Sequence, residues 1–384
     1  MHSRCRTAAL CGLTLLVLAS AKGRADFFLQ TNLVSDGAVP AAFTDPNLQN
    51  PWGISFSPTG PFSISDNGTG LATLYSGTGQ PTSVAITIPP SGNASPTGQV
   101  FNSTSDFHAN TSLFVSEDGT ISGWRSALGM TAETLVPGSN QNVYKGVALA
   151  SNASGNFMYA TNFRAGTIDV FDKNLTPARL SGSFTDPNGL PAGFAPFGIQ
   201  NLGGKLYVTY AKQDTDKHDD VKGPGNGFVD VFDTNGNFLK RIATGNPGNA
   251  SNALNSPWGL ALAPATFGAF GGDLLVGNFG NGHINVFDPN SADPNGTFLG
   301  QLTTDLAGTP VAIDGLWGLT FGNGGQGGDP NLLYFTAGLN GEMDGLFGSL
   351  QPAAAPVPEP GTAALLVLGG MSLWVFHYRR RQRS

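Results

Sequence analysis

SPWGLALA, residues 256–263, is one of six copies of a short pattern in this chain. The other copies are NPWGISFS (residues 50–57), SPTGQVFN (95–102), YKGVALA (144–150), APFGIQN (195–201) and GLWGLTF (315–321). The glycines that they share are Gly53, Gly98, Gly146, Gly198, Gly259 and Gly318, at spacings of 45, 48, 52, 61 and 59 residues. A four-stranded blade with its turns needs roughly forty to sixty residues, so the six copies predict a six-bladed β-propeller.

The segments that follow the copies indicate an all-β fold. The clearest of them contain further apolar runs separated by Gly/Asn turns, as in MYATNFRAGTIDVFDKN (158–174) and LLVGNFGNGHINVFDPN (274–290). The chain contains 54 Gly and 26 Pro but only 12% charged residues, a composition typical of many tight turns. No stretch between residues 27 and 350 keeps apolar residues at helical spacing for three turns. We therefore expect short strands joined by turns.

The sixth copy lacks one strand of its blade. It supplies apolar runs near residues 317–321, 332–336 and 343–350 and then enters a proline-rich tail. The run FFLQTNLV (27–34), at the other end of the chain, belongs to no copy. We expect it to pair antiparallel with 343–350 as the outermost strand of the last blade, because this pairing closes the ring and protects a sheet edge.

Two sets of residues are predicted to meet at one mouth of the central channel. In an up-and-down blade, the turn before the innermost strand and the turn between the second and third strands emerge on the same face. Aromatic rings with carboxamide or carboxylate oxygens can stack on sugars or surround a hard cation. The alternative is that the Trp residues pack between blades and the Asn residues only cap turns. The candidate ligand-binding residues are Trp52, Lys145, Asn162, Phe197, Trp258, Asn278 and Trp317.

The fourth copy contains an unusually long, charged insertion, QDTDKHDDVKGPGN, at residues 213–226. It lies in the turn between the second and third strands, so we expect it at the same mouth. Its candidate ligands for Ca²⁺, an ion that takes six to eight oxygen ligands, are Asp214, Asp216, Asp219 and Asp220. Three lysines in or beside the insertion offset part of the charge, so a solvated acidic loop remains the alternative. The insertion matches no recognised calcium-loop spacing, and Ca²⁺ is the one cofactor that the sequence suggests.

Catalytic motifs are scarce, and the charge excludes one class of partner. There is no G-x-S-x-G, H-E-x-x-H or Walker pattern, so no catalytic residue is assigned. Between residues 26 and 356 the chain has eleven Lys plus Arg against twenty-five Asp plus Glu, a net charge of −14. A surface this acidic repels nucleic-acid phosphates and suits cations, neutral glycans or basic partners.

Both termini carry targeting patterns. Arg4 and Arg6 precede an apolar run and small residues, which is the layout of a signal peptide over residues 1–25, and both cysteines lie inside it. At the other end Pro358, Glu359 and Pro360 precede an apolar segment (363–376) and a basic end. This order predicts a short membrane helix with its basic end in the cytoplasm. We therefore divide the chain into a signal peptide, a propeller at 26–351 and a linker plus tail at 352–384.

The tail resembles the PEP-CTERM sorting signal of Gram-negative bacteria, which exosortase recognises and cleaves in that family. The alternative is a plain C-terminal membrane anchor. The blade pattern P-[WF]-G, followed by a T-N or G-N turn and a [VI]-x-V-F-D strand, resembles NHL-type six-bladed propellers. The whole ectodomain also resembles a family of exported bacterial propellers with no assigned chemistry. These resemblances imply processing by signal peptidase and exosortase, contact with the membrane through the C-terminal helix before cleavage, and export to the cell envelope, surface or extracellular matrix.

Two functions follow as hypotheses. The first is a non-catalytic binding module for extracellular polysaccharide or envelope protein partners, as implied by the sorting signal. The second is a divalent-metal-dependent, lactonase-like hydrolase with its site at the channel mouth, as in some six-bladed relatives.

Overall fold

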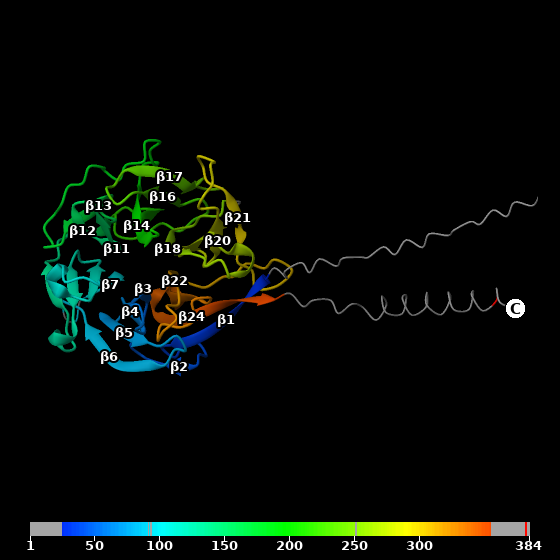
Figure 1. Ribbon diagram of the computed structural model, residues 1–384, viewed down its shortest axis with the longest axis horizontal. Helices are drawn as coiled ribbons and strands as arrows, with labels where there is room; N and C mark the ends of the chain where they lie inside the picture. The colour runs from blue at the N-terminus through cyan, green and yellow to red at the C-terminus, as the bar shows by residue number, and fades with distance from the viewer. Residues whose placement is uncertain (1–24, 91, 93, 250–251, 355–380, 382–384) are drawn as a thin grey trace, which may run out of the picture. The chain divides into compact units, whose positions relative to one another are not determined.

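The computed structural model describes residues 25–354, except 91, 93 and 250–251, together with Arg381. Residues 25–353 form one compact unit. Figure 1 shows its sheets arranged in a ring, and within the described residues there are six of them. The prediction of an all-β, six-bladed propeller is confirmed. The proposed signal peptide and the PEP-CTERM tail lie outside the described residues, and no helix within the described part is long and apolar enough to cross a membrane.

The blades follow one another along the chain, and each runs outward from its innermost strand. Blade one is β3 (Pro51–Phe56), β4 (Phe62–Asp66), β5 (Leu71–Tyr75) and β6 (Pro81–Thr87), and blade two is β7 (Pro96–Phe101), β8 (Ser112–Ser116), β9 (Ile121–Trp124) and β10 (Glu133–Val136). Blade three is β11 (Tyr144–Asn152), β12 (Gly155–Asn162) and β13 (Thr167–Asp172), and blade four is β14 (Phe194–Leu202), β15 (Lys205–Lys212), β16 (Phe228–Phe232) and β17 (Phe238–Ala243). Blade five is β18 (Pro257–Leu262), β19 (Leu274–Asn278), β20 (Ile284–Phe287) and β21 (Phe298–Gln301). Blade six contains β22 (Leu316–Phe321), β23 (Leu333–Gly338) and β24 (Asp344–Ala354), completed by β1 (Ala25–Ser35) and β2 (Phe43–Thr44).

Blade three differs from the expected four strands. In place of a fourth strand, a single bridge joins Phe171 to Pro177, and Ala178 N–H donates to Val170 O. The helical elements of the described residues are short. They are η1 (Phe107–Ala109), η2 (Ser126–Leu128), η3 (Gly268–Phe270) and α1 (Leu339–Glu342).

The repeated glycines allow the six innermost strands to approach one another around the axis. A Cβ atom built on Gly198 would lie 2.2 Å from Trp258 O, and one on Gly259 would lie 2.4 Å from Trp317 O. The same atom on Gly318 would lie 2.7 Å from Trp52 O, which joins the last blade to the first. Only glycine fits this close approach of two backbones. The space left on the axis is a cavity of about 30 Å³ lined by all six glycines, enough for about two water molecules.

A threonine on the second strand connects neighbouring blades. In blade three Gly146 N–H donates to Thr161 Oγ1 at 2.7 Å, and the Thr161 hydroxyl donates to Phe197 O of blade four at 2.7 Å. Thr336 makes the same connection from Gly318 to Trp52 O, at 2.8 and 2.6 Å. Each such hydroxyl satisfies a buried amide and a buried carbonyl of adjacent blades.

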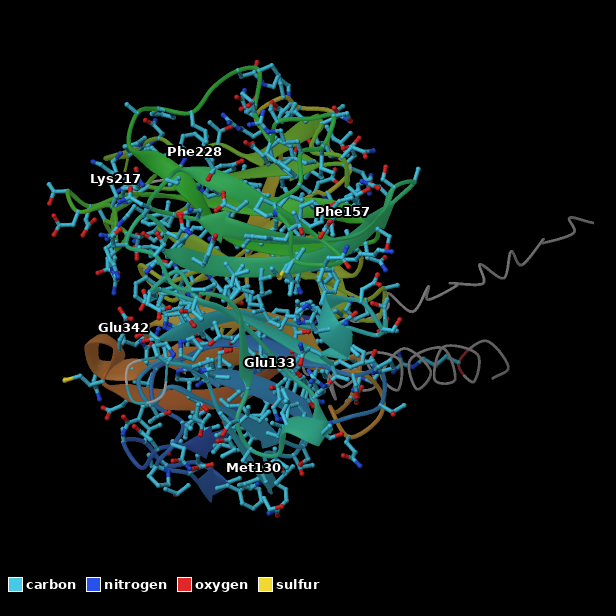
Figure 2. The ribbon with its side chains drawn as sticks, turned by 90° about the vertical axis from the view of Figure 1, so that its left-hand side faces the viewer. Met130, Glu133, Phe157, Lys217, Phe228 and Glu342 are labelled. Carbon is cyan, nitrogen blue, oxygen red and sulfur yellow. The ribbon has the colours of Figure 1, made fainter. Side chains whose placement is uncertain are left out.

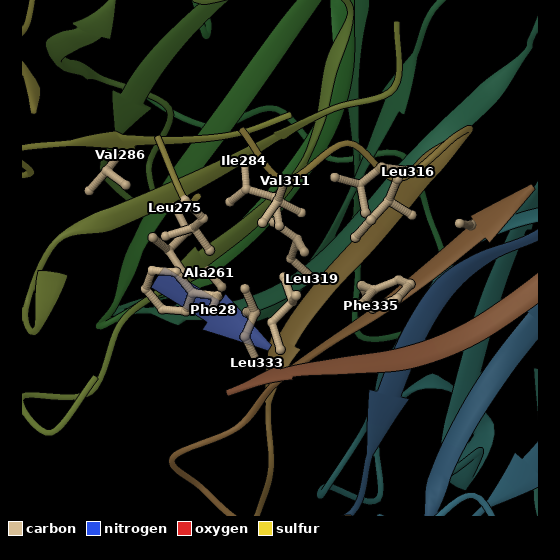
Figure 3. Packing of buried hydrophobic residues seen from close by; sticks show 14 of the residues in the cluster. Phe28, Ala261, Leu275, Ile284, Val286, Val311, Leu316, Leu319, Leu333 and Phe335 are labelled. Carbon is tan, nitrogen blue, oxygen red and sulfur yellow. The ribbon is translucent and has the colours of Figure 1, made fainter. Parts of the chain in front are cut away.

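The N-terminal strand closes the ring as predicted, but the two-residue strand β2, which pairs with β1 in parallel, is the outermost strand of the blade. β1 is the hydrogen-bonded neighbour of β24 in blade six. Asp36 N–H donates to Gly345 O, whereas Gly348, three residues further along, lies against Thr31 O, so the two strands are antiparallel. Phe28 extends from β1 into the apolar cluster between blades five and six (Figure 3), where its ring lies 5.1 Å from that of Phe267.

Candidate functional site

Three aromatic rings from three blades form a column at the channel mouth. Trp317 of blade six stacks on Trp52 of blade one with ring centroids 3.5 Å apart, and on Phe279 of blade five with centroids 3.9 Å apart. Two rings this near one centroid cannot share a face, so Trp317 lies between the other two. Trp258 meets Trp52 and Trp317 edge-on, and Phe197 meets Trp317 edge-on. The edge-on contacts are among the favourable arrangements for aromatic rings.

A lysine lies at each end of the column. Lys145 Nζ is 5.0 Å from the centroid of the Trp52 ring, and Lys222 Nζ is 3.9 Å from the centroid of Phe279. Both distances are within the range of a cation–π interaction. The two lysines differ in exposure, because Lys145 is buried and Lys222 is exposed.

Carboxylates and carboxamides connect the column to the surrounding turns. The Lys145 ammonium donates to Glu117 and, at 3.3 Å, to Asp219. Glu117 also accepts from Asn67 at 3.1 Å. Asn50 connects these groups to blade six. Its Nδ2 donates to Asn67 at 3.2 Å and to Glu342 at 3.0 Å. Its Oδ1 accepts from Trp317 Nε1 at 3.2 Å. These bonds join turns from blades one, two, three, four and six around the aromatic rings.

The charged insertion of blade four lies over this mouth. Figure 2 shows Lys217 of the insertion and Glu342 of blade six at the same edge of the propeller. Asp219 Oδ1 accepts a hydrogen bond from the Lys145 ammonium and lies 2.9 Å from His218 Nδ1. Gln213 Nε2 donates to Phe163 O of blade three. The insertion therefore belongs to the same site as the aromatic column.

The backbone of the mouth is strained at several non-glycine positions. Asn50 and Ser256, which directly precede the Pro-Trp-Gly of blades one and five, have φ angles of 44° and 48°. Glu342 has a φ of 71° and Lys217 of 54°. Such conformations cost roughly 1–3 kcal/mol each and cluster at binding and catalytic sites.

The charged groups at the mouth have shifted pKa values. Burial alone would lower the pKa of Lys145, but the negative charges of Glu117 and Asp219 outweigh it and raise that pKa. Burial, with the charge of Glu117, raises the pKa of Glu342. Burial favours a higher pKa for Asp219, yet Lys145 and His218 outweigh it and lower that pKa. Lys145 therefore stays cationic at neutral pH.

Five of the seven predicted ligand-binding residues come together: Trp52, Lys145, Phe197, Trp258 and Trp317. The other two brace turns. Asn162 Nδ2 donates to Asn142 and Asp169, both at 2.9 Å, and Asn278 Nδ2 donates to Ala253 O at 2.7 Å. The rings of Trp52 and Trp317 are 3% and 1% exposed and pack against each other, so they offer no free face to a sugar.

The four predicted calcium ligands do not all converge. Asp219 contacts Lys145 and His218, and Asp220 is largely covered, with burial raising its pKa. Asp214 accepts the backbone N–H of His218 at 2.9 Å, and Asp216 is exposed.

Phe279 and Asn50 are the functional candidates that sequence reasoning missed. Phe279 follows Asn278 in GNFGNG, and Phe163 follows Asn162 in TNFRAG. Both rings join the mouth cluster. The aromatic residue after the repeated Asn was therefore the signal that could have identified Phe279.

One group of side chains has the composition of a metal site. Single ligand atoms of Glu117, His218 and Asp219 lie within 4.8 Å of one another. The ammonium of Lys145 already contacts both carboxylates of this group. A divalent ion there would face a buried positive charge, so the donor set does not fit a metal while Lys145 holds this position.

The fold and the mouth together define a six-bladed β-propeller with a lysine-capped aromatic column at one end of its channel. The chain belongs to the family that includes two uncharacterized proteins of Acanthamoeba polyphaga mimivirus. Protein R648 is 32% identical over 360 residues, covering 88% of this chain and 84% of the relative. Protein L690 is 34% identical over 342 residues, covering 83% and 84%. No family model matches the chain.

Solved structures with a related architecture include enzymes of low sequence similarity. The periplasmic gluconolactonase PpgL of Pseudomonas aeruginosa is 13% identical, with a TM-score of 0.49 over 85% of this chain and 97% of that one. Virginiamycin B lyase of Staphylococcus aureus is 14% identical, with a TM-score of 0.45 over 84% and 98%.

Proposed function

We propose that the protein is an exported, non-catalytic binding module of the cell envelope or surface, which holds protein or polysaccharide partners at its channel mouth. The observation that carries this proposal is the position of Lys145. Its ammonium is buried and lies among the carboxylates that a metal-dependent propeller would need for an ion. The charge that a metal would bring is already supplied by a side chain.

The surroundings of Lys145 support the same conclusion. The column of Trp52, Trp317 and Phe279 fills the space above the axis, and the remaining axial cavity of about 30 Å³ is too small for an organic substrate. A ligand therefore has to contact the loops around the mouth. Loops held by a rigid scaffold are the usual carriers of binding surfaces.

The experiment that tests this proposal is metal analysis of the purified ectodomain by mass spectrometry, combined with melting curves in millimolar Ca²⁺ and in chelator. We expect no stoichiometric divalent metal and a melting temperature that neither treatment changes, because a ligand that binds the folded state would raise it. The proposal would be contradicted if each chain held one ion tightly, and if a chelator removed both this ion and an activity that hydrolyses lactones.

That outcome would support the second candidate, a divalent-metal-dependent, lactonase-like hydrolase. The observation in its favour is the convergence of Glu117, His218 and Asp219 within 4.8 Å. The variant Lys145→Met separates the two candidates. If it gains metal, the carboxylates form a latent metal site. If it loses stability without binding metal, Lys145 is a structural cation.

Export and processing are the second part of the proposal. Signal peptidase would remove about residues 1–25, and exosortase would cleave near Pro358, Glu359 and Pro360 and release the membrane segment. Intact-mass measurement on protein from the native host and from a host without exosortase tests this. A C-terminus that stays intact in the native host would contradict the sorting signal.

A further inference from the structure

Lys222 occupies the outer end of the aromatic column. Its ammonium lies 3.9 Å from the centroid of Phe279, whose other face stacks on Trp317. Lys222 is exposed, whereas Phe279 is 3% exposed. An exposed lysine on a flexible stem is therefore what covers a buried ring at the mouth.

Two acidic groups lie near enough to the Lys222 ammonium to feel its charge. Burial raises the pKa of Asp220 and of Glu342, and Lys222 acts to lower both, although it forms no ion pair within 4.0 Å with either of them. An aromatic face flanked by carboxylates is the arrangement that proteins use to bind an organic cation. The same arrangement attracts a neutral group less strongly and repels an anionic one.

Two buried oxygens lie near this place, Asp220 Oδ2 and the hydroxyl of Ser256, a residue with no exposed surface. The Ser256 side chain interacts with the Asp220 carboxylate and acts to lower its pKa, and neither oxygen has another partner among the described residues. The backbones of Ser256 and Phe279 are neighbours, since the Ser256 carbonyl accepts from the Phe279 backbone N–H at 2.9 Å. A carboxylate and a hydroxyl that contact each other both keep free lone pairs. The two oxygens can therefore accept hydrogen bonds from the N–H groups of an ammonium.

We propose that this surface binds the ammonium group of a lysine side chain from a partner protein, and that Lys222 occupies the same place in the free protein. This inference rests on the binding function proposed above and names the chemistry of its ligand. The group seen on Phe279 is itself a primary ammonium on a four-carbon stem, which shows that a lysine fits. Val221 and Met343, which are 36% and 72% exposed, add apolar surface for a protein partner on the loop of Lys222 and on the hairpin of Glu342.

The test compares two variants that remove the same charge from the same loop. Lys222→Gln frees Phe279, whereas Lys217→Gln removes an exposed lysine that the inference does not involve. Calorimetric titration uses tetralysine, its side-chain-acetylated form and a glucosamine tetrasaccharide, in 150 mM salt to limit non-specific attraction. We expect Lys222→Gln to bind tetralysine about tenfold more tightly than the Lys217→Gln protein, a gain in the range of one desolvated cation–π contact. The acetylated peptide should not bind.

Adding Phe279→Leu to Lys222→Gln should abolish the gain, and circular dichroism identifies a variant that fails to fold. Should that occur, Phe279→Tyr, which keeps a ring face, should retain the gain. Equal affinity of the Lys222→Gln and Lys217→Gln proteins would overturn the inference, because charge alone would then explain binding. A gain confined to the glucosamine tetrasaccharide would overturn the assignment of a protein partner. A metal-loaded, hydrolytic protein would instead refute the proposed function, whatever the peptide result.

Discussion

Truncating Phe28 to alanine should destabilise the propeller strongly, because this side chain ties the N-terminal strand to the boundary between the last two blades. Phe28 is 2% exposed and packs against Phe267 and Phe270 at centroid distances of 5.1 and 6.3 Å. Replacing a buried Phe by Ala costs about 3–5 kcal/mol. Because two ring contacts are lost together with the buried area, we expect a loss of about 4 kcal/mol.

Leu29→Ala is the matched control. Leu29 is the next residue of β1, but its side chain is 53% exposed because successive side chains of a strand point to opposite faces. We expect its replacement to change the free energy of unfolding by less than about 0.5 kcal/mol. Both values come from urea unfolding followed by circular dichroism, with linear extrapolation to water.

The contrast between the two variants tests the closure of the ring. If Phe28→Ala cost less than about 1 kcal/mol and matched Leu29→Ala, β1 would not contribute to the folded unit. Deleting residues 25–35 should have a larger effect, since it exposes the edge of β24 and leaves a strand free to pair between molecules. Aggregation of this deletion protein at concentrations where Leu29→Ala stays monomeric would support the closure, and a monomeric deletion protein would contradict it.

Three further predictions concern buried charge and the glycine ring. Burial raises the pKa of Asp66, so native stability should fall as the pH rises from about 4 toward the folded-state pKa, at up to about 1.4 kcal/mol per pH unit. Asp66→Asn should remove this dependence of stability on pH in melting curves between pH 4 and 8. An unchanged pH dependence in this variant would count against the prediction. Lys145→Met should lower the free energy of unfolding by about 3–5 kcal/mol, because it leaves Glu117 without its buried cation. Asp219→Asn changes a side chain that is 66% exposed and should lower it by less than about 1 kcal/mol. Equal losses in urea unfolding would contradict the role of Lys145 as a buried cation. Gly198→Ala should prevent folding or lower the melting temperature sharply, because the added Cβ would lie 2.2 Å from Trp258 O, and a variant as stable as wild type would show that the inner strands can separate.

Much of the architecture could be predicted from the sequence because it depends on local requirements that recur. A position where two backbones approach closely tolerates only glycine, so the inner-strand glycines recur in every blade, although their spacing varies from 45 to 61 residues. The unpaired run at 27–34 could be assigned by counting strands. The missing fourth strand of blade three could not be predicted in this way. The segment at Pro177 has the sequence of a turn and pairs with β13 through one bridge only.

The candidate site was predicted in part. Topology alone places Trp52, Lys145 and Trp317 on one face, and their blades bring them together as expected. Topology does not say which way a ring points. The rings of Trp52 and Trp317 stack on each other rather than facing a ligand, and Phe279, which was not among the predicted site residues, becomes the outer ring.

The sequence by itself determined the number of blades, the position of the inner strands and the strand that closes the ring, because these features follow from repeated short-range patterns. Only the tertiary structure decided that Lys145 pairs with Glu117 and with Asp219 of the insertion at 213–226. It also decided that Trp317 donates to Asn50, 267 residues away. Such contacts exist only after the ring has closed, since their energy depends on the distance and burial that the assembled blades impose rather than on any local preference of the chain.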